Sequence, residues 1–268
     1  MLLNRIGYIL PMDVLQEYFP TKSIKHAEAR LNALLREEQA RLDKIATFFN
    51  RENAIDQDNL ISELPIISKF VSSYHQIFTD YLKAALPQHK VEVKCGPHCG
   101  NCCHHYPMSI SPFEIIALYA EVRDSDALFT YMNKCFSRAE RFQSLLDRSG
   151  QDHLDEGEDH DPEEKALHDF FNEWLPCPFI QEDQSCTFYQ FRPVTCRMYF
   201  SETEPKYCVP LHLQTTLNRS FIVYLPDEIE ESIALLSKHY ENLNLSEGLY
   251  EGMLQMNALE GKVFYGAV

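Results

Sequence analysis

No stretch of hydrophobic residues in this 268-residue chain is long enough to cross a lipid bilayer, which needs about 20 consecutive apolar residues. The short apolar run Ile6–Leu10 is also too brief for the core of a secretory signal peptide. We therefore expect a cytoplasmic protein that does not enter a membrane. In that reducing compartment, clustered cysteines are more often metal ligands than disulfides.

Basic residues are also scarce, with 24 lysines and arginines against 40 aspartates and glutamates and a formal net charge of −16. A field of that sign repels phosphate backbones, so binding to nucleic acid or to an anionic membrane would require a local basic patch. The densest basic stretch, 22–41, is interleaved with glutamates and is typical of the solvated face of a helix. We therefore expect no nucleic acid and no membrane among the partners, which leaves a protein partner or a small-molecule substrate.

The sequence contains no internal repeat and no regular alternation of strands and helices of the kind that builds a parallel sheet. Hydrophobic residues instead recur with helical spacing from about Thr21 to Asn50 and from Asp58 to about Leu86. These two long amphipathic helices, joined by a short polar link, are expected to form an antiparallel hairpin. Pro65 is expected to delay the start of the second helix or to kink it.

Further helices are expected downstream. Ser111-Pro112-Phe113-Glu114 has the capping-box pattern of a serine, a proline and a glutamate, and we interpret Glu114 as a capping residue in preference to a catalytic one. Helical spacing continues from about Ser125 to Leu146. Pro226-Asp227-Glu228 opens another helix after a short strand within Ser220–Leu225.

Two stretches are interpreted from composition. The segment Gln151–Glu164 contains eight acidic residues and two histidines, and a solvated loop is preferred over a metal-loading tract. The last twenty residues predict a short helix and an apolar tail, Val263–Val268. The expected fold is mainly α, with a helical hairpin and further helices around an irregular cysteine-ligated metal centre and few or no strands. We divide it into an N-terminal helical segment (1–87), a cysteine-cluster metal-binding domain (88–210) and a C-terminal helical segment (211–268) packed on the same core.

Eight of the nine cysteines fall into two blocks. The first block runs Cys95-Gly-Pro-His-Cys99-Gly-Asn-Cys102-Cys103, and its glycines, proline and asparagine permit the tight turns that aim nearby thiolates at one metal. Side chains of adjacent residues usually diverge, so Cys102 and Cys103 can both be ligands most easily if they serve different metals or different irons. A disulfide between them would be strained.

The second block contains Cys177-Pro-Phe-Ile, then Cys186-Thr-Phe-Tyr, then Arg192-Pro-Val-Thr-Cys196-Arg197 and, after a gap, Cys208. Eight thiols are enough for two four-thiolate sites, or for one four-thiolate cluster with spare thiols. We expect these eight candidate metal ligands to converge in space: Cys95, Cys99, Cys102, Cys103, Cys177, Cys186, Cys196 and Cys208. Arg192 and Arg197 are expected to bind around the cofactor, offsetting negative charge and donating hydrogen bonds to sulfur or to loop carbonyls.

Residues beside the blocks have more ordinary interpretations. Cys135 lies on an apolar helical stripe, and we interpret it as a core residue. His98, His104 and His105 flank the first block and stay open as alternative ligands, because zinc accepts imidazole. The spacing of Cys95, Cys99 and Cys102 also occurs in radical S-adenosylmethionine enzymes. In that class the cluster loop follows the first strand of a β/α barrel, whereas two long helices precede it here.

Together the two blocks resemble the YkgJ-like cysteine-cluster family, also written CxxCxxCC, whose members are described as chelating zinc or iron. The residues that match the motif are Gly100, Cys102, Cys103, Cys177, Pro178, Phe179, Cys186, Tyr189, Arg192, Pro193, Cys196 and Arg197. Glu114 stands where family members often carry a glutamate. The chain departs from the pattern by one extra residue between Cys95 and Cys99, by Ile180 in place of leucine and by Phe188 in place of isoleucine.

The resemblance implies a bound metal more than a particular reaction. The family is related to proteins that resemble flagellin lysine N-methylases, which implies an iron–sulfur site acting with S-adenosylmethionine, and older family names imply an iron–sulfur oxidoreductase. We therefore expect a metal-binding protein that coordinates a 4Fe–4S cluster, favoured narrowly, or Zn²⁺ through both blocks. An iron–sulfur enzyme of the oxidoreductase or methylase type and a zinc-stabilised protein-interaction module are the alternatives. Nothing in the sequence singles out one thiol as a nucleophile.

Overall fold

The computed structural model describes residues 22–48, 54–89, 92–156, 161–213 and 215–261. Within these ranges the fold is mainly helical, as predicted, and contains one small two-stranded sheet. The α-helices are α1 (Lys22–Phe48), α2 (Gln57–Ala85), α3 (Pro112–Val122), α4 (Leu128–Glu156), α5 (Pro162–Asn172), α6 (Val194–Arg197), α7 (Asp227–Ser237) and α8 (Leu249–Leu259). The 3-10 helices are η2 (Leu86–His89), η3 (Asn101–His104), η4 (Tyr189–Phe191), η5 (Pro205–Tyr207), η6 (Pro210–His212) and η7 (Lys238–Leu243), and the strands are β1 (Tyr199–Ser201) and β2 (Ser220–Ile222).

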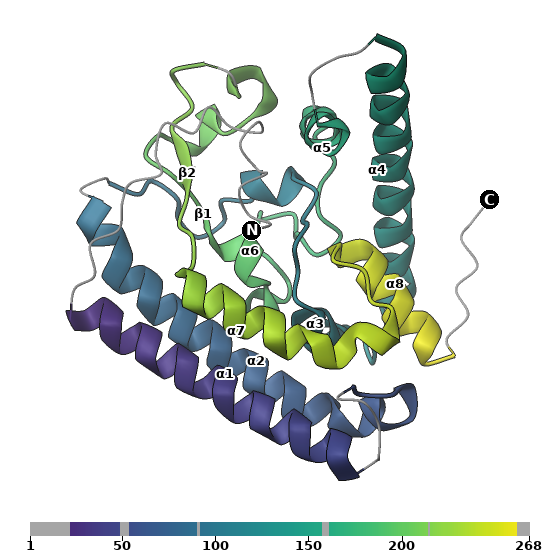
Figure 1. Cartoon of the computed structure of the whole chain (residues 1–268). Helices are drawn as coiled ribbons and strands as arrows, with labels where there is room; N and C mark the ends of the chain where they lie inside the picture. Colours follow the sequence, from purple (N-terminus) through teal and green to yellow (C-terminus); the bar gives the residue numbers. More distant parts are fainter. Residues whose placement is uncertain (1–21, 49–53, 90–91, 157–160, 214, 262–268) are drawn as a thin grey trace.

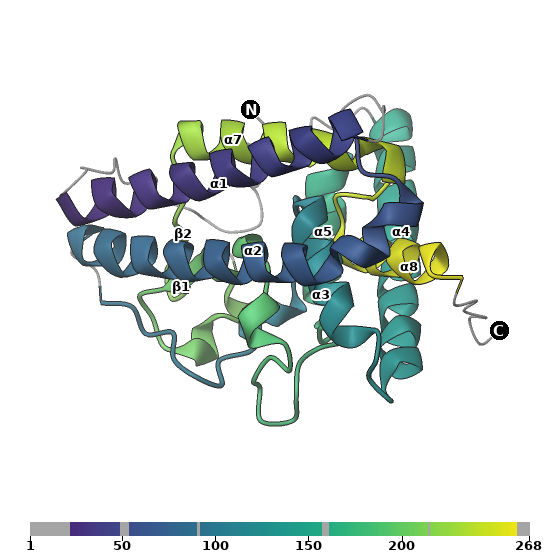
Figure 2. The same ribbon diagram turned by 90° about the horizontal axis from the view of Figure 1, so that it is seen from below.

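Helices α1 and α2 form the expected antiparallel hairpin, and α7 runs alongside α1 (Figures 1 and 2). The hairpin buries leucines of α1, such as Leu31 and Leu35, against the apolar stripe of α2. Asp56 caps α2 by accepting a hydrogen bond of 2.8 Å from the backbone nitrogen of Asn59. The delay expected from Pro65 is wrong, because α2 already begins at Gln57 and continues through the proline.

The hydrophobic core continues from the hairpin through α3 to the pair formed by α4 and α8. Helix α3 is buried on almost every side, since Phe113, Ile115 and Ile116 have no exposed surface. Gly252 lets α8 approach α3 closely, because a Cβ atom at this position would lie 2.6 Å from the Cδ1 atom of Ile115. This close contact joins the C-terminal part of the chain to the same core.

The expected acidic loop is wrong over most of its length. Helix α4 continues past Leu146 to Glu156, and α5 begins at Pro162, so much of Gln151–Glu164 is helical; residues 157–160 lie outside the described part of the chain. Lys165 offsets the acidic charge by contacting Asp152 at 3.5 Å and Asp169 at 3.3 Å. Local ion pairing and the packing of α4 against α5 therefore stabilise helices that composition alone did not predict.

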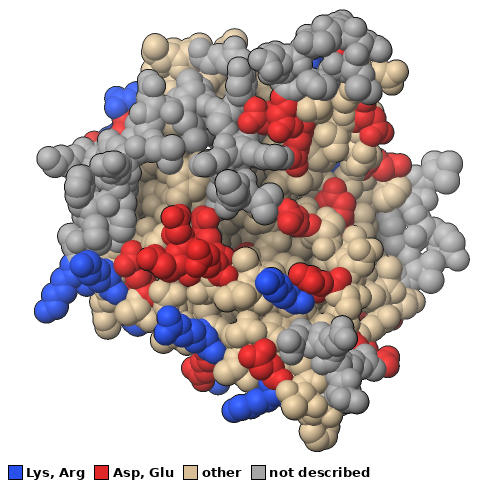
Figure 3. Space-filling model, in the orientation of Figure 1, with Lys and Arg blue, Asp and Glu red and all other residues tan. Residues whose placement is uncertain are grey.

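The C-terminal elements follow the sequence prediction more closely. Strand β2 lies within the predicted strand segment and pairs antiparallel with β1, with Ser201 opposite Ser220. Helix α7 opens with acidic residues that face the positive end of its dipole, and Figure 3 shows acidic side chains gathered over this end of the helix. Helix α8 accounts for the expected short helix, while the predicted apolar tail lies outside the described residues.

Among the described residues, none of the helices combines the length and the apolar character that a membrane span requires.

Candidate metal centre

Backbone hydrogen bonds hold the two cysteine blocks side by side. The nitrogen of Cys177 donates to the carbonyl oxygen of Cys103 at 2.9 Å, and the nitrogen of Lys94 donates to that of Ser201 at 2.8 Å. Both ends of the first block are therefore tied to the second block, although the two are far apart in the sequence.

A tight turn in the second block explains one glycine of the first. Ile180 and Cys186 form an antiparallel bridge, and Gln184 at its tip has a positive φ of 66°. Gly100 lies directly against this turn, since a Cβ atom there would be 2.4 Å from the Cδ1 atom of Ile180 and 2.7 Å from the side chain of Gln184. A larger residue at position 100 would require the side chains of Ile180 and Gln184 to shift, and its Cβ atom would also lie 3.2 Å from the carbonyl oxygen of Gln184.

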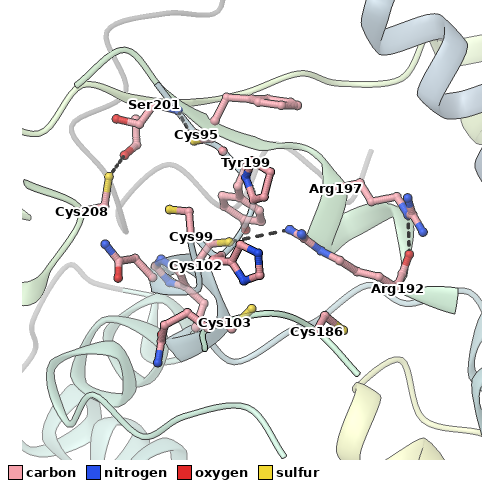
Figure 4. A pocket seen from close by; sticks show the side chains of 18 of the residues that line it. Cys95, Cys99, Cys102, Cys103, Cys186, Arg192, Arg197, Tyr199, Ser201 and Cys208 are labelled. Carbon is pink, nitrogen blue, oxygen red and sulfur yellow. Dashed lines mark hydrogen bonds between the residues drawn. The ribbon is translucent and has the colours of Figure 1, made fainter. Parts of the chain in front are cut away.

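Six of the thiols line a cavity of about 680 Å³, the large cavity. They are Cys95, Cys99, Cys102, Cys103, Cys186 and Cys208, and Figure 4 shows them arranged around it together with two arginines. Other walls come from Leu82 of α2 and from Tyr199 and Ser220 of the two strands. The strand pair and the end of the hairpin thus shape the space that the thiols face.

A second cavity of about 50 Å³, the small cavity, adjoins the first. The cysteines that line it are Cys102, Cys103, Cys177, Cys186 and Cys196. Its remaining walls include the apolar side chains of Phe179, Phe188 and Leu249. All eight cysteines predicted to be ligands therefore lie around two adjoining cavities, which share three of them.

The sulfur atoms are not drawn together on a common point. Within the described ranges, no group of three or more histidine, cysteine, aspartate or glutamate side chains is arranged so that it could hold a metal ion. The cysteines are free thiols, and hydrogen bonds link Cys95 with Cys99 and Cys102 with Cys103. The donor set nevertheless fits zinc and iron, both of which bind thiolate sulfur. Binding of a metal ion would therefore require the cysteine side chains to move closer together.

Neighbouring groups favour the thiolate form at two positions. A hydrogen bond from the Cys103 thiol, reinforced by the charge of Arg192, lowers the pKa of Cys102 to about 5 against the opposing effect of burial. A hydrogen bond from Cys95 lowers the pKa of Cys99 to about 7, again against burial. The two thiols that donate, Cys95 and Cys103, have raised pKa values because they hydrogen-bond to these thiolates. Thiolate is the form that binds metal.

The two arginines make different contacts. Arg192 places Nη2 3.7 Å from the sulfur of Cys102 and also donates to the carbonyl oxygen of Cys196. Burial alone would lower the pKa of Arg192, but the charges of the neighbouring thiolates outweigh it and raise that pKa. Arg197 instead donates to backbone carbonyls, at 2.6 Å to both Arg192 and Tyr189. Arg192 is thus the residue that contacts sulfur, and Arg197 holds the loop that carries it.

The capping role predicted for Glu114 is wrong. The side chain of Ser111 makes no capping hydrogen bond, and Glu114 is only 2% exposed. Its Oε1 atom accepts hydrogen bonds from His75 at 2.7 Å and from the backbone nitrogen of Val194 at 2.8 Å. Glu114 therefore joins α2 and α3 to the segment that carries Arg192 and Cys196. The family position of this glutamate was the one signal in the sequence for such a role.

The three histidines beside the first block have other contacts. His98 is exposed and lies 3.1 Å from Asp183. His104 stacks on Trp174 with ring centroids 3.9 Å apart, and His105 stacks on Phe171 at the same distance. Burial lowers the pKa of His105 to about 3, so its ring is neutral. These stacking contacts fix the polypeptide that leaves the first block.

Sequence analysis missed Arg138 of α4, which is only 4% exposed. Its guanidinium group donates to the carbonyl oxygens of Leu175 and His105, and it lies 4.6 Å from the ring centre of Phe170. These carbonyls belong to the segments beside Cys177 and Cys103, so the hydrogen bonds of Arg138 link α4 to both cysteine blocks. The sequence signal was an arginine three residues after Cys135, on an otherwise apolar helical stripe.

Replacing Cys135 by serine is expected to lower the free energy of unfolding by about 1–3 kcal/mol, because the serine hydroxyl would be buried in an apolar core where the cysteine side chain packs. Cys135 has no exposed surface and belongs to the core, as predicted. We expect the metal content of the Cys135→Ser variant to match that of the unmodified protein. Elemental analysis measures the metal content, and urea denaturation measures the stability. Loss of metal in this variant alone would reverse the assignment of Cys135 to the core.

Residues 94–212 match the model of the CxxCxxCC family, whose printed description is "Putative zinc- or iron-chelating domain". The matched range begins one residue before Cys95 and ends after Cys208, so it contains both cysteine blocks. Neither a curated protein nor a solved structure matches the chain. Both blocks therefore fall within the matched range, whereas Leu82, Ser220 and Leu249 complete the walls of the cavities from outside it, and over residues 94–212 the chain is similar to the CxxCxxCC family.

Proposed function

We propose that this chain coordinates an iron–sulfur cluster through the thiols of its two cysteine blocks. The observation that carries the proposal is the gathering of eight free thiols around two adjoining cavities. Lowered pKa values at Cys99 and Cys102 favour the ligand form of sulfur. The spacing of Cys95, Cys99 and Cys102 suits three corners of a cubane. Zinc is the alternative, because a tetrahedral four-thiolate site is a common structural zinc site.

Arg192 supports a site of high negative charge. Several thiolates and a cluster concentrate charge in a region of low dielectric constant, and a nearby guanidinium offsets part of it. Arg192 contacts the sulfur of Cys102 and interacts electrostatically with Cys196 and Cys103. The segments that hold these cysteines contain few regular elements, so bonds from thiolate to metal would add folding free energy there.

A second candidate is an iron–sulfur enzyme, and the large cavity favours it. Its volume of about 680 Å³ lies within the range of about 300–1,000 Å³ that small-molecule sites occupy. Its walls combine apolar side chains such as Leu86 and Phe200 with the positive charge of Lys83. A cluster at the cysteine end would leave room for a substrate at the other end. Electron transfer and S-adenosylmethionine-dependent methyl transfer are the two reaction types to test, and the relation to flagellin methylases stays a prediction.

Protein produced with ample iron and kept anaerobic is expected to contain stoichiometric iron and acid-labile sulfide, with a broad visible absorption band from sulfur-to-iron charge transfer. Elemental analysis, sulfide determination and an absorption spectrum measure this directly. Stoichiometric zinc without sulfide under the same conditions would contradict the cluster and favour a zinc-stabilised protein-interaction module.

A further inference from the structure

We propose that the eight-thiol region contains two metal sites with different roles. An open site is formed by Cys95, Cys99 and Cys102 and holds an iron–sulfur cluster beside the large cavity. A closed site is formed by Cys103, Cys177, Cys186 and Cys196 and holds one zinc ion. The proposal rests on the proposed function for the iron–sulfur cluster, but it limits the cluster ligands to three thiols of the first block and assigns a zinc ion to four others.

The two cavities divide most of the thiols. Cys95 and Cys99 line the large cavity and not the small one, whereas Cys177 and Cys196 line the small cavity and not the large one. Cys103 lies at the boundary, and its carbonyl oxygen accepts a hydrogen bond from the nitrogen of Cys177. That bond ties Cys103 to the second block, so the division does not simply follow the order of the two blocks in the sequence.

The electrostatic neighbours of the thiols support the same division. Cys99 and then Cys102 are the thiols that act on Cys95. Cys177 is the first thiol to act on Cys186 and on Cys196, and it acts on Cys103 after Cys102. Cys177 is thus the common neighbour of the closed set. Cys102 is the link between the sets, because it adjoins Cys103 in the chain and also acts on both Cys95 and Cys196.

Two separate metal sites explain how the neighbouring residues Cys102 and Cys103 can both be metal ligands. Neighbouring residues direct their side chains differently, and one metal is not easily bound by both. In the proposed division Cys102 completes the three-thiol set and Cys103 completes the four-thiol set. The hydrogen bond between their sulfur atoms shows that the two sites would be close neighbours.

The sizes of the cavities determine what each site can hold. The small cavity, at about 50 Å³, has room for about four water molecules, which suits one ion and not the eight atoms of a cubane. Four thiolates and apolar walls are the features of a closed structural zinc site. The three thiols of the open set leave one coordination position facing the large cavity, as a reactive or ligand-binding centre requires.

Cys208 belongs to neither set. It lines the large cavity, and its sulfur lies 3.8 Å from the hydroxyl oxygen of Ser220. A Cys135→Ser variant serves as the control, because it removes the one thiol that lies outside both blocks and lines neither cavity.

The experiment measures iron, sulfide and zinc per chain in the full-length protein, produced with both metals and purified anaerobically. The unmodified chain is expected to contain about four iron, about four sulfide and about one zinc. Cys99→Ser is expected to lose iron and sulfide at least about tenfold while keeping its zinc, because one of three thiolates is missing. Cys196→Ser is expected to lose zinc and solubility, and Cys135→Ser is expected to keep both metals.

Loss of zinc together with iron in Cys99→Ser, or a single metal centre in the unmodified chain, would overturn the two-site proposal while leaving metal binding intact. Absence of iron and sulfide from the unmodified chain, with or without zinc, would instead contradict the proposed function. Since the closed site contributes folding energy, Cys196→Ser is expected to be hard to purify. The decision therefore rests on the unmodified chain and on Cys99→Ser.

Discussion

Replacing Arg138 by methionine is expected to lower the free energy of unfolding by about 3–5 kcal/mol, one of the two largest effects of a single substitution that we expect. Arg138 is buried and donates to two backbone carbonyls, those of His105 and Leu175. Methionine would fill similar space but leave both carbonyls without a donor, at about 1–3 kcal/mol each. It would also remove the cationic contact with the aromatic rings of Phe170 and Tyr250. Urea denaturation followed by circular dichroism measures the loss.

The same helix offers a control for this variant. Arg141 pairs with Glu173 near the surface, where its side chain is 40% exposed, so Arg141→Met is expected to cost no more than about 1 kcal/mol. A second readout is metal content, because the carbonyls that Arg138 holds lie two residues from Cys103 and from Cys177. Equal stability of the two variants would show that the buried contacts of Arg138 contribute little.

Replacing Glu114 by alanine is expected to lower the free energy of unfolding by a similar amount, about 3–5 kcal/mol, because it removes the buried hydrogen-bond partner of two polar groups. The Nδ1 atom of His75 faces the carbonyl oxygen of Gln190 at 3.0 Å, and its Nε2 atom faces Glu114 at 2.7 Å. Both ring nitrogens of His75 therefore lie at hydrogen-bond distance from oxygen atoms of other segments. Alanine would leave the Nε2 atom of His75 and the backbone nitrogen of Val194 buried without this hydrogen-bond partner. Denaturation curves measure the change.

The effect should extend from stability to the metal centre. Glu114 positions the start of α6, which carries Cys196, and Gln190 lies in the η4 segment next to Arg192. We therefore expect Glu114→Ala to contain less metal than the unmodified protein in elemental analysis. Glu121→Ala, at an exposed position of the same helix, should change stability by less than about 0.5 kcal/mol and leave the metal content unchanged. Full metal content in the Glu114 variant would contradict its positioning role.

Helices were the part of the fold that the sequence predicted best. The hairpin of α1 and α2 and the position of α7 follow from apolar residues at helical spacing, which is a local property of the chain. The acidic stretch after Leu146 was misassigned, because composition reports how a segment interacts with water and not what it packs against. Helix α4 continues there since it has α5 as a neighbour and Lys165 as a partner for its acidic residues.

Glu114 shows the same limit at a single residue. Its spacing from Ser111 satisfied the capping-box pattern, and local reasoning had no cause to look further. The buried acceptor that Val194 and His75 require comes from segments far along the chain. Only the packing of α2 against α3 brings these groups to the glutamate, and the cost of leaving them unpaired then determines its role.

The sequence by itself determined that the chain is mainly helical and that residues 94–212 carry a thiol-rich segment that matches the CxxCxxCC family model, because helical periodicity and motif spacing are properties of residues close together in the sequence. It also supplied the eight thiols, but not their grouping. The tertiary structure alone decided that Cys177 and Cys196 line the small cavity and that Cys95 and Cys99 line the large one. That division depends on contacts such as the hydrogen bond between Cys177 and Cys103, whose partners are brought together by folding and by no local rule.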